Sequence, residues 1–128
     1  MRLKHFNLSF GEQVFKALAD ESRIRILHLI VRNKEMCTSD LEHVLDFTQT
    51  KTSRHLAYLR NAGLVTSRKL DQWVYYTIKD EAADFVTQIF KYLERDTLLH
   101  KDVETYRILY SNRELAANKI LTRRWPVP

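Results

Sequence analysis

The stretch from Phe47 to Val65 constrains the fold of this chain most strongly, because it predicts a helix with two different faces. Thr48 is a good N-cap, since its hydroxyl can accept a hydrogen bond from an amide of the first turn. Gly63 can adopt the left-handed conformation that ends many helices. Between these two residues, one side of the helix is predicted to be buried by a stripe at helical spacing, formed by Thr52, Leu56 and Leu59.

The other side of this helix carries small polar groups and one arginine. At about 100° per residue it presents Thr50, Ser53, Arg54 and Ala57, with Lys51 on its flank. Small side chains let a helix approach the DNA major groove closely, and arginine can bond guanine edges in bidentate fashion. A solvated surface helix is the alternative interpretation, and the neighbouring segments decide between the two.

A short helix is predicted directly before this one. Ser39 and Glu42 have capping-box spacing, which predicts a helix that runs through roughly Leu45. Two helices three residues apart, with a small polar entry to the second, are typical of a helix-turn-helix.

The pattern changes from helical to alternating after Gly63. Trp73 to Ile78 is predicted to be a strand, with Val65 to Leu70 as its antiparallel partner. The turn near Asp71 and Gln72 lacks the glycine that a two-residue hairpin prefers. A basic hairpin after such a helix can contact phosphates or the minor groove, although a hairpin that only covers the core has the same pattern.

Further helices flank this unit on both sides. Capping-box spacing at Ser9 predicts the start of a first helix, and Asp20 is predicted to start a second. Asp80 opens a helix to about Arg95, after which helical spacing continues, with a new capping box at Ser111.

The helix after the hairpin has an unusually broad apolar surface. Ala82, Val86, Ile89 and Leu93 form one stripe, and Phe85 and Phe90 lie outside it. This surface is too broad for one neighbour in a small domain, so a second subunit is expected to cover it.

Composition limits the class of protein. The length of 128 residues predicts one domain, and two glycines and two prolines favour a mostly helical chain. The net charge of +5 permits nucleic-acid binding, and one cysteine excludes an internal disulfide. No signal peptide or membrane-spanning run is apparent, so we expect a cytoplasmic protein without a membrane partner. We do not expect an enzyme, because no nucleophile–base pair, phosphate-binding glycine loop or close ligand cluster is apparent.

With these segments in order, the chain resembles the ArsR/SmtB family of bacterial winged-helix repressors. The resemblance covers roughly residues 10 to 80 and is carried by Phe15 to Asp20, Arg23 to Leu27, Glu35 to Leu41, Gln49 to Val65 and Trp73 to Tyr76. It implies a homodimeric winged helix-turn-helix fold, mostly α with a small β-hairpin wing. It also implies repression at an inverted-repeat operator in double-stranded DNA, and release by an inducer that is often a metal ion.

The resemblance predicts the organisation and the functional residues of this chain. We expect residues 1–128 to form one winged helix-turn-helix domain, with the N-terminal helix and the C-terminal helices (about 80–121) for dimerisation. The predicted dimer contacts are Val14, Leu18, Val86, Ile89 and Leu93.

The resemblance also predicts the DNA contacts. Carried over position by position, the residues that would approach the bases are Gln49, Thr50, Ser53 and Arg54, with His55 to the side. The phosphate candidates are Lys51, Arg60, Arg68 and Lys69.

This chain departs from the family pattern at the effector site. The family's metal-sensing segment has two cysteines separated by one residue, whereas this chain has Cys37 and Ser39. Soft metals and arsenite prefer several thiolates. Asp96, His100 and Glu104 could share a helical face, but one imidazole with two carboxylates is more often a solvated charged patch. We therefore expect no metal and no cofactor, and an inducer that remains unidentified.

Two questions stay open at this point. Cys37 is either an effector thiol or, as is more common, a buried and inert one. The leading hypothesis is a sequence-specific dimeric repressor. The alternatives are a winged-helix module that binds proteins without reading DNA, or a metal- or thiol-responsive sensor that uses Cys37.

Overall fold

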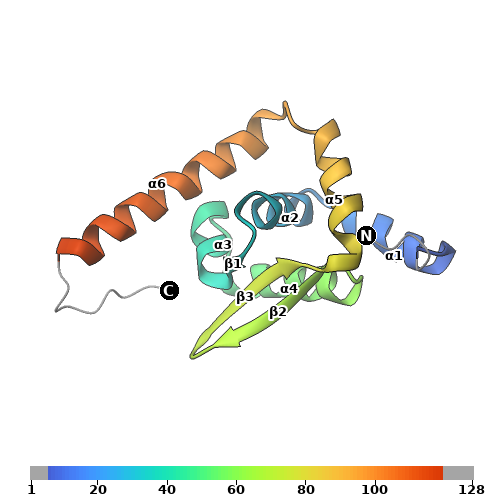
Figure 1. The fold of residues 1–128 in the computed structure, drawn as a ribbon, viewed down its shortest axis with the longest axis horizontal. Coiled ribbons are helices and arrows are strands. Elements are labelled where there is room, and N and C mark those ends of the chain that lie inside the picture. Colours follow the sequence, from blue (N-terminus) through green and yellow to red (C-terminus); the bar gives the residue numbers. More distant parts are fainter. Residues whose placement is uncertain (1–5, 120–128) are drawn as a thin grey trace.

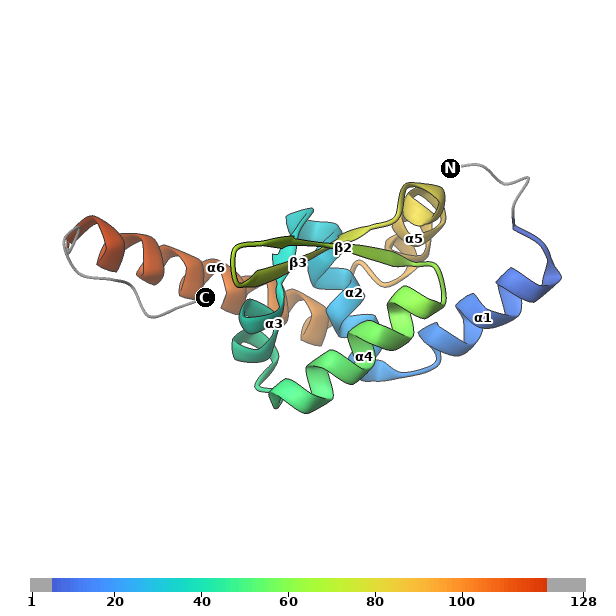
Figure 2. The same cartoon turned by 90° about the horizontal axis from the view of Figure 1, so that it is seen from below.

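The computed structural model describes residues 6–119, and the side chains of residues 6–110. In chain order the elements are α1 (Leu8–Leu18), α2 (Glu21–Asn33), β1 (Met36–Cys37), α3 (Thr38–Leu45), α4 (Gln49–Asn61), β2 (Val65–Leu70), β3 (Trp73–Ile78), α5 (Asp80–Tyr92) and α6 (Thr97–Lys119). Helices α1 and α5 lie at one end of the molecule, and α6 projects beyond the other end (Figures 1 and 2).

Helix α2 forms the centre of the core. Its residues Ile26, Leu27, Leu29 and Ile30 have no exposed surface. Helices α1, α4, α5 and α6 and strands β1 and β3 all pack against α2. Helix α2 is therefore covered on several sides, and the other elements are arranged around it.

The first two helices begin at polar caps. The Asn7 side chain accepts a hydrogen bond from the Phe10 amide at 2.9 Å, so α1 begins at Leu8. The predicted capping box at Ser9 is therefore wrong, because the preceding asparagine already fills that role. The predicted start of the second helix at Asp20 is confirmed, since its carboxylate accepts a hydrogen bond from the Arg23 amide at 3.0 Å.

The hairpin has the predicted bounds and one unpredicted neighbour. Strand order is β1-β3-β2, and both pairings are antiparallel. Asp71 closes the two-residue turn with φ of 56°, a left-handed conformation that aspartate tolerates better than most residues. Strand β1 has only two residues, which is too short to produce an alternating pattern in the sequence.

Helix α3 begins one residue before the predicted capping box. Cys37 is its N-cap and makes no side-chain capping bond, so the box proposed for Ser39 and Glu42 does not form. The reason is that Cys37 pairs with Tyr75 in the sheet and the chain enters the helix directly from that strand.

The C-terminal helices differ from the prediction in their bounds. Helix α5 ends at Tyr92 rather than near Arg95. Helix α6 begins after Asp96, whose carboxylate accepts a hydrogen bond from the Leu99 amide at 3.0 Å, and it continues through Ser111 without the predicted restart. Residues 120 and 121, the end of the region predicted for dimerisation, lie outside the described residues. Within the described part, no helix combines the length and apolar character needed to cross a membrane.

Two of the predicted dimer contacts belong to the core of the single chain. Val14 is 0% exposed and Val86 is 1% exposed, so neither side chain can touch a second copy. Leu18 and Leu93 pack against the same core and are only partly buried, and Ile89 is also partly buried. We therefore remove Val14 and Val86 from the predicted dimer contacts, because both side chains are buried in the core, where α2 packs against α1 and α5.

Candidate nucleic-acid interface

Helix α4 is held at both ends by the predicted local signals. The Thr48 hydroxyl accepts a hydrogen bond from the Lys51 amide at 3.1 Å. Gly63 follows the helix with φ of +83°, which a side chain would disfavour. These two residues fix where α4 begins and ends, and therefore which of its side chains face the core and which face solvent.

The inner face of α4 is the predicted stripe. Thr52, Leu56 and Leu59 have no exposed surface. The buried hydroxyl of Thr52 donates a hydrogen bond of 2.9 Å to the Thr48 carbonyl oxygen one turn earlier. A threonine is therefore tolerated at this buried position, since its one polar group is satisfied by the helix itself.

The outer face of α4 presents the predicted base-reading residues to solvent. Gln49, Thr50, Ser53 and Arg54 are all exposed. Arg54 makes no hydrogen bond or ion pair with any other residue whose side chain the structure describes. Its guanidinium is therefore available to a ligand without the loss of an internal contact.

Lys51 occupies the flank of α4. Its ammonium nitrogen lies 3.9 Å from the centroid of the Phe47 ring, a cation–π contact with the turn before the helix. Lys51 is half-buried, and its ammonium group lies beside the turn that precedes α4. This is the end of a recognition helix that usually lies deepest in the groove.

His55 does not face outward. It is 7% exposed, and its Nδ1 lies 3.5 Å from a guanidinium nitrogen of Arg23 on α2. Burial lowers the pKa of His55, and the nearby Asp20 carboxylate partly offsets this effect. We remove His55 from the set expected to contact DNA, because its ring packs inside the chain.

The two basic residues of the wing have different surroundings. Arg68 donates two hydrogen bonds, of 2.7 and 2.9 Å, to the Glu35 carboxylate, and this contact raises the pKa of the arginine. Lys69 is exposed near the tip and has no such partner among the described residues. The charge of Arg68 is already compensated, so Lys69 is the stronger phosphate candidate. Arg60 is also exposed, near the end of α4.

Arg23 is a structural link that the sequence reasoning missed. Its guanidinium lies 4.0 Å from the centroid of the Tyr58 ring on α4, and it donates hydrogen bonds to the carbonyl oxygens of Lys16 and Ala17 at the end of α1. No periodic pattern distinguishes such an arginine from a solvated one, so the sequence held no signal for it.

Comparison with known proteins places this arrangement in a family. The model of the bacterial regulatory protein, arsR family, matches residues 20–67, which include α3 and α4. The arsenic resistance transcriptional regulator ArsR2 of Pseudomonas putida is 41% identical over 78 residues, which are 61% of this chain and 68% of that protein. The chain belongs to the arsR family.

Other members and neighbours of the arsR family agree with this assignment. Regulator ArsR1 of Pseudomonas putida is 46% identical over 78 residues, and this match spans 61% of this chain and only 61% of that protein. The transcriptional regulator HlyU of Vibrio vulnificus is 37% identical, with a TM-score of 0.57, over 71% of this chain and 97% of that structure. A homodimeric winged helix-turn-helix DNA-binding domain from Mycobacterium bovis is 26% identical, with a TM-score of 0.62, over 78% of this chain and 92% of that domain.

Against this family background, the environment of Cys37, the possible effector thiol, does not favour reactivity. Cys37 is 2% exposed, and its Sγ lies 3.5 Å from the Ser39 hydroxyl oxygen. Burial raises the pKa of the Cys37 thiol, and the contact with Ser39 offsets this only in part. A buried thiol with a raised pKa holds little thiolate, so it is a poor nucleophile and a poor soft-metal ligand.

The second set of potential metal ligands is dispersed by other contacts. Asp96 caps α6, His100 contacts the Glu94 carbonyl oxygen, and Glu104 pairs with Arg107. Among the residues that the structure describes, no three histidine, cysteine or carboxylate side chains gather as a metal site within one chain.

Proposed function

We propose that this protein is a sequence-specific transcriptional repressor that binds double-stranded DNA as a homodimer. The observation that carries the proposal is the division of α4, which has three core residues on one face and four exposed polar residues on the other. Membership in the arsR family supports the same function.

In this proposal the outer face of α4 enters the major groove. Arg54 would pair with a guanine edge, and Gln49, Thr50 and Ser53 would contact neighbouring bases or the adjacent backbone. The phosphate contacts would come from Lys51, Arg60 and Lys69, with Arg68 contributing only after its pair with Glu35 opens. Base contacts would then supply the specificity, and the lysines and arginines the salt-dependent affinity.

The homodimer would form through the end of the molecule that carries α1 and α5. Leu8 is 89% exposed, Phe15 is 61% exposed and Tyr92 is 88% exposed, all on these two helices. The Phe15 ring lies against Phe85 of α5, with 6.4 Å between the ring centroids. Large exposed apolar groups on adjacent helices are typical of a surface covered by a second subunit. The homodimeric domain from Mycobacterium bovis supports this assembly.

The decisive experiment is footprinting of the purified protein on the promoter region of its own gene. We expect protection of two inverted half-sites separated by one or two helical turns, because a two-fold symmetric dimer reads a two-fold symmetric operator. Affinity for that fragment should fall steeply with salt and exceed affinity for a scrambled fragment of equal length. Equal affinity for both fragments would instead favour a module that binds proteins.

We further propose that neither a soft metal ion nor oxidation of Cys37 is the signal that releases DNA. The burial of Cys37 supports this view, because a thiol with little access reacts slowly with oxidants and electrophiles. Operator binding should be unchanged in Cys37→Ser and in the presence of zinc, cadmium or arsenite. Retention of one such ion per subunit after dialysis against a weak chelator would contradict the proposal.

A further inference from the structure

Helix α1 contacts the end of α4 through the ring of Phe10. A β-carbon at Gly63 would lie only 2.8 Å from Cε1 of this ring, so the glycine permits a close approach. This contact joins the first half of α1 to the residue at which the chain leaves α4.

A second contact joins the other end of α1 to Tyr58, near the end of α4. Arg23 Nε donates to the Ala17 carbonyl oxygen at 2.8 Å, and Nη2 donates to the Lys16 carbonyl oxygen at 3.2 Å. The same guanidinium covers the ring of Tyr58. Helices α1 and α4 are thus joined at two places.

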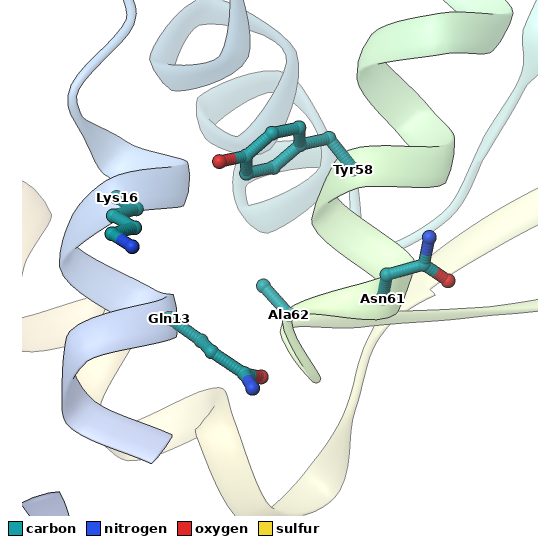
Figure 3. A pocket seen from close by; sticks show the side chains of 5 residues that line it. All are labelled: Gln13, Lys16, Tyr58, Asn61 and Ala62. Carbon is teal, nitrogen blue, oxygen red and sulfur yellow. The ribbon is translucent and has the colours of Figure 1, made fainter. Parts of the chain in front are cut away.

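A cavity of about 280 Å³ lies between these two contacts (Figure 3). It is lined by Gln13 and Lys16 of α1 and by Tyr58, Asn61 and Ala62 at the end of α4. Figure 3 shows the Tyr58 ring reaching from α4 toward α1, and Gln13 reaching from α1 toward Ala62. The amide of Asn61 is turned away from α1.

The lining combines apolar surfaces with hydrogen-bond donors. The Tyr58 ring and the Ala62 methyl group supply the apolar part, and the Gln13 amide, the Tyr58 hydroxyl and the Lys16 ammonium supply donors. Ligand sites commonly enclose roughly 300–1,000 Å³, and this cavity lies just below that range, so it suits only a small molecule with a single ring. Lys16 is the one cationic residue in the lining, and the nearby Arg23 guanidinium already donates to the Ala17 and Lys16 carbonyl oxygens. One available ammonium group suits a single carboxylate rather than a phosphate chain.

Lys16 can exchange its present partner for a ligand. Its ammonium nitrogen lies 3.5 Å from the Glu12 carboxylate, and the two side chains are 64% and 66% exposed. An ion pair this exposed contributes little to stability, so a ligand carboxylate can replace Glu12 at low cost.

We propose that the α1–α4 cavity binds a small monocyclic carboxylate, and that its occupancy changes the affinity of the protein for DNA. The ligand's ring lies against Tyr58, and its carboxylate accepts hydrogen bonds from Lys16 and Gln13. The second half of the proposal rests on the proposed function, because it requires a protein that binds an operator.

The connection to DNA follows from what each helix carries. Helix α1 bears Leu8 and Phe15, which we assign to the subunit interface, and α4 bears the residues assigned to the bases. A molecule wedged between them changes the angle of α4 relative to the dimer axis. The spacing of the two recognition helices then no longer matches the half-sites. Because the ligand binds this altered arrangement more tightly than the DNA-bound one, it favours the DNA-free protein.

The binding half is tested by titrating the full chain with benzoate while NMR follows the side-chain amides. We expect the Gln13 amide signals to shift with a dissociation constant on the order of 1 mM or below, while those of Gln88 on α5 stay in place. Benzamide, which lacks the charge, should bind more weakly than benzoate. No shift of the Gln13 signals would overturn the proposal.

Variants assign the binding to this cavity. Lys16→Met removes the ammonium group and keeps most of the apolar stem, and it should weaken benzoate binding roughly tenfold or more, as expected for a lost charge-assisted hydrogen bond. Tyr58→Leu should weaken binding by removing the ring. Lys101→Met, at an exposed lysine on α6, is the matched control and should bind benzoate like the wild type. Equal binding by Lys16→Met and the wild type would overturn the assignment.

The regulatory half is tested by operator affinity at constant ionic strength. We expect saturating benzoate to change the affinity of the wild type and of Lys101→Met but not of Lys16→Met. Benzoate binding with unchanged operator affinity would overturn the regulatory half alone. A protein that binds benzoate but no DNA would instead contradict the proposed function, while the proposed ligand site would still be supported.

Discussion

Arg25 on α2 and Asp102 on α6 form a bidentate ion pair, with two nitrogen–oxygen distances of 2.9 Å. Asp102 is only 3% exposed, whereas the Arg25 side chain retains 19% of its exposure. The contact with Asp102 raises the pKa of Arg25. Within the part of α6 whose side chains are described, this pair connects the central helix to the long C-terminal helix, on which Leu99 is also buried.

Asp102→Asn should destabilise the fold, because it leaves the guanidinium of Arg25 partly buried without a compensating charge. Breaking a fully buried pair costs about 3–5 kcal/mol, and the residual exposure of Arg25 reduces our expectation to roughly 2–3 kcal/mol. Urea unfolding followed by circular dichroism measures the loss. Arg107→Ala, which breaks an exposed pair on the same helix, is the control and should leave the midpoint unchanged. Equal midpoints for Asp102→Asn and wild type would contradict the prediction.

The buried histidine of α2 should make stability depend on pH. His28 is 4% exposed, its Nδ1 has no hydrogen-bond partner among the described residues, and its ring packs against Phe90 at 5.0 Å between centroids. Burial, followed by the charge of Arg32, lowers the pKa of His28 in the folded chain, while Asp102 partly opposes this shift. The unfolded chain takes up a proton near its ordinary pKa of about 6.5, whereas the folded chain does so only at lower pH.

It follows that neutral His28 makes its full contribution to the free energy of unfolding above a pH of about 6.5. This contribution declines as the pH falls below that value. His28→Leu should remove this part of the decline, so its urea midpoint should change less between pH 7.5 and pH 5.5 than that of the wild type. His43→Gln, at an exposed histidine on α3, should keep the wild-type dependence. If His28→Leu shows the wild-type dependence on pH, burial of His28 is not its source.

Recognition of bases should depend on Arg54. Because this side chain is exposed and makes no contact that the fold needs, Arg54→Ala should keep the wild-type unfolding midpoint. It should lose about 1–3 kcal/mol of operator binding and little of its binding to a scrambled fragment. Fluorescence anisotropy with both fragments measures the difference. Arg95→Ala, between α5 and α6, controls for the loss of one exposed positive charge. Unchanged operator affinity in Arg54→Ala would remove Arg54 from the recognition surface.

The wing should contribute charge mainly through Lys69. Lys69→Ala should weaken binding to all DNA fragments alike and reduce the slope of log affinity against log salt by about one. Arg68→Ala should reduce that slope less, because Glu35 already compensates its charge. A salt titration of the two variants provides the comparison. A larger effect of Arg68→Ala than of Lys69→Ala would show that the Glu35 pair opens on DNA.

The dimer interface should depend on Phe15. At 61% exposure this side chain contributes little to the fold of one subunit, so Phe15→Glu should stay folded. The new charge would be buried without a partner between subunits, so the variant should sediment as a monomer and bind the operator weakly. Ile89→Asp is a less informative test, because Ile89 is half-buried and the charge would also enter the core. A wild-type protein that is monomeric at micromolar concentration would contradict the proposed homodimer.

The local elements of this fold could be predicted from the sequence because their signals act over a few residues. The Thr48 cap, the left-handed Gly63 and the alternation of Trp73 to Ile78 each depend on neighbours in the chain. The inner stripe of α4 likewise followed from helical spacing alone. These features were enough to predict a helix-turn-helix with a wing.

Only the tertiary structure decided which of the remaining side chains are exposed and can contact DNA or a second subunit. His55 lies about 40° around α4 from Leu59, at the edge of the stripe, and spacing alone could not say how far the core extends. Val14 and Val86 have the pattern of an interface, but both belong to the core of one subunit. The contacts of Arg23, Arg25 and Arg68 join residues far apart in the chain, and no local pattern predicts such a partner. Burial and charge compensation depend on what packs against a residue, which is set by the fold as a whole.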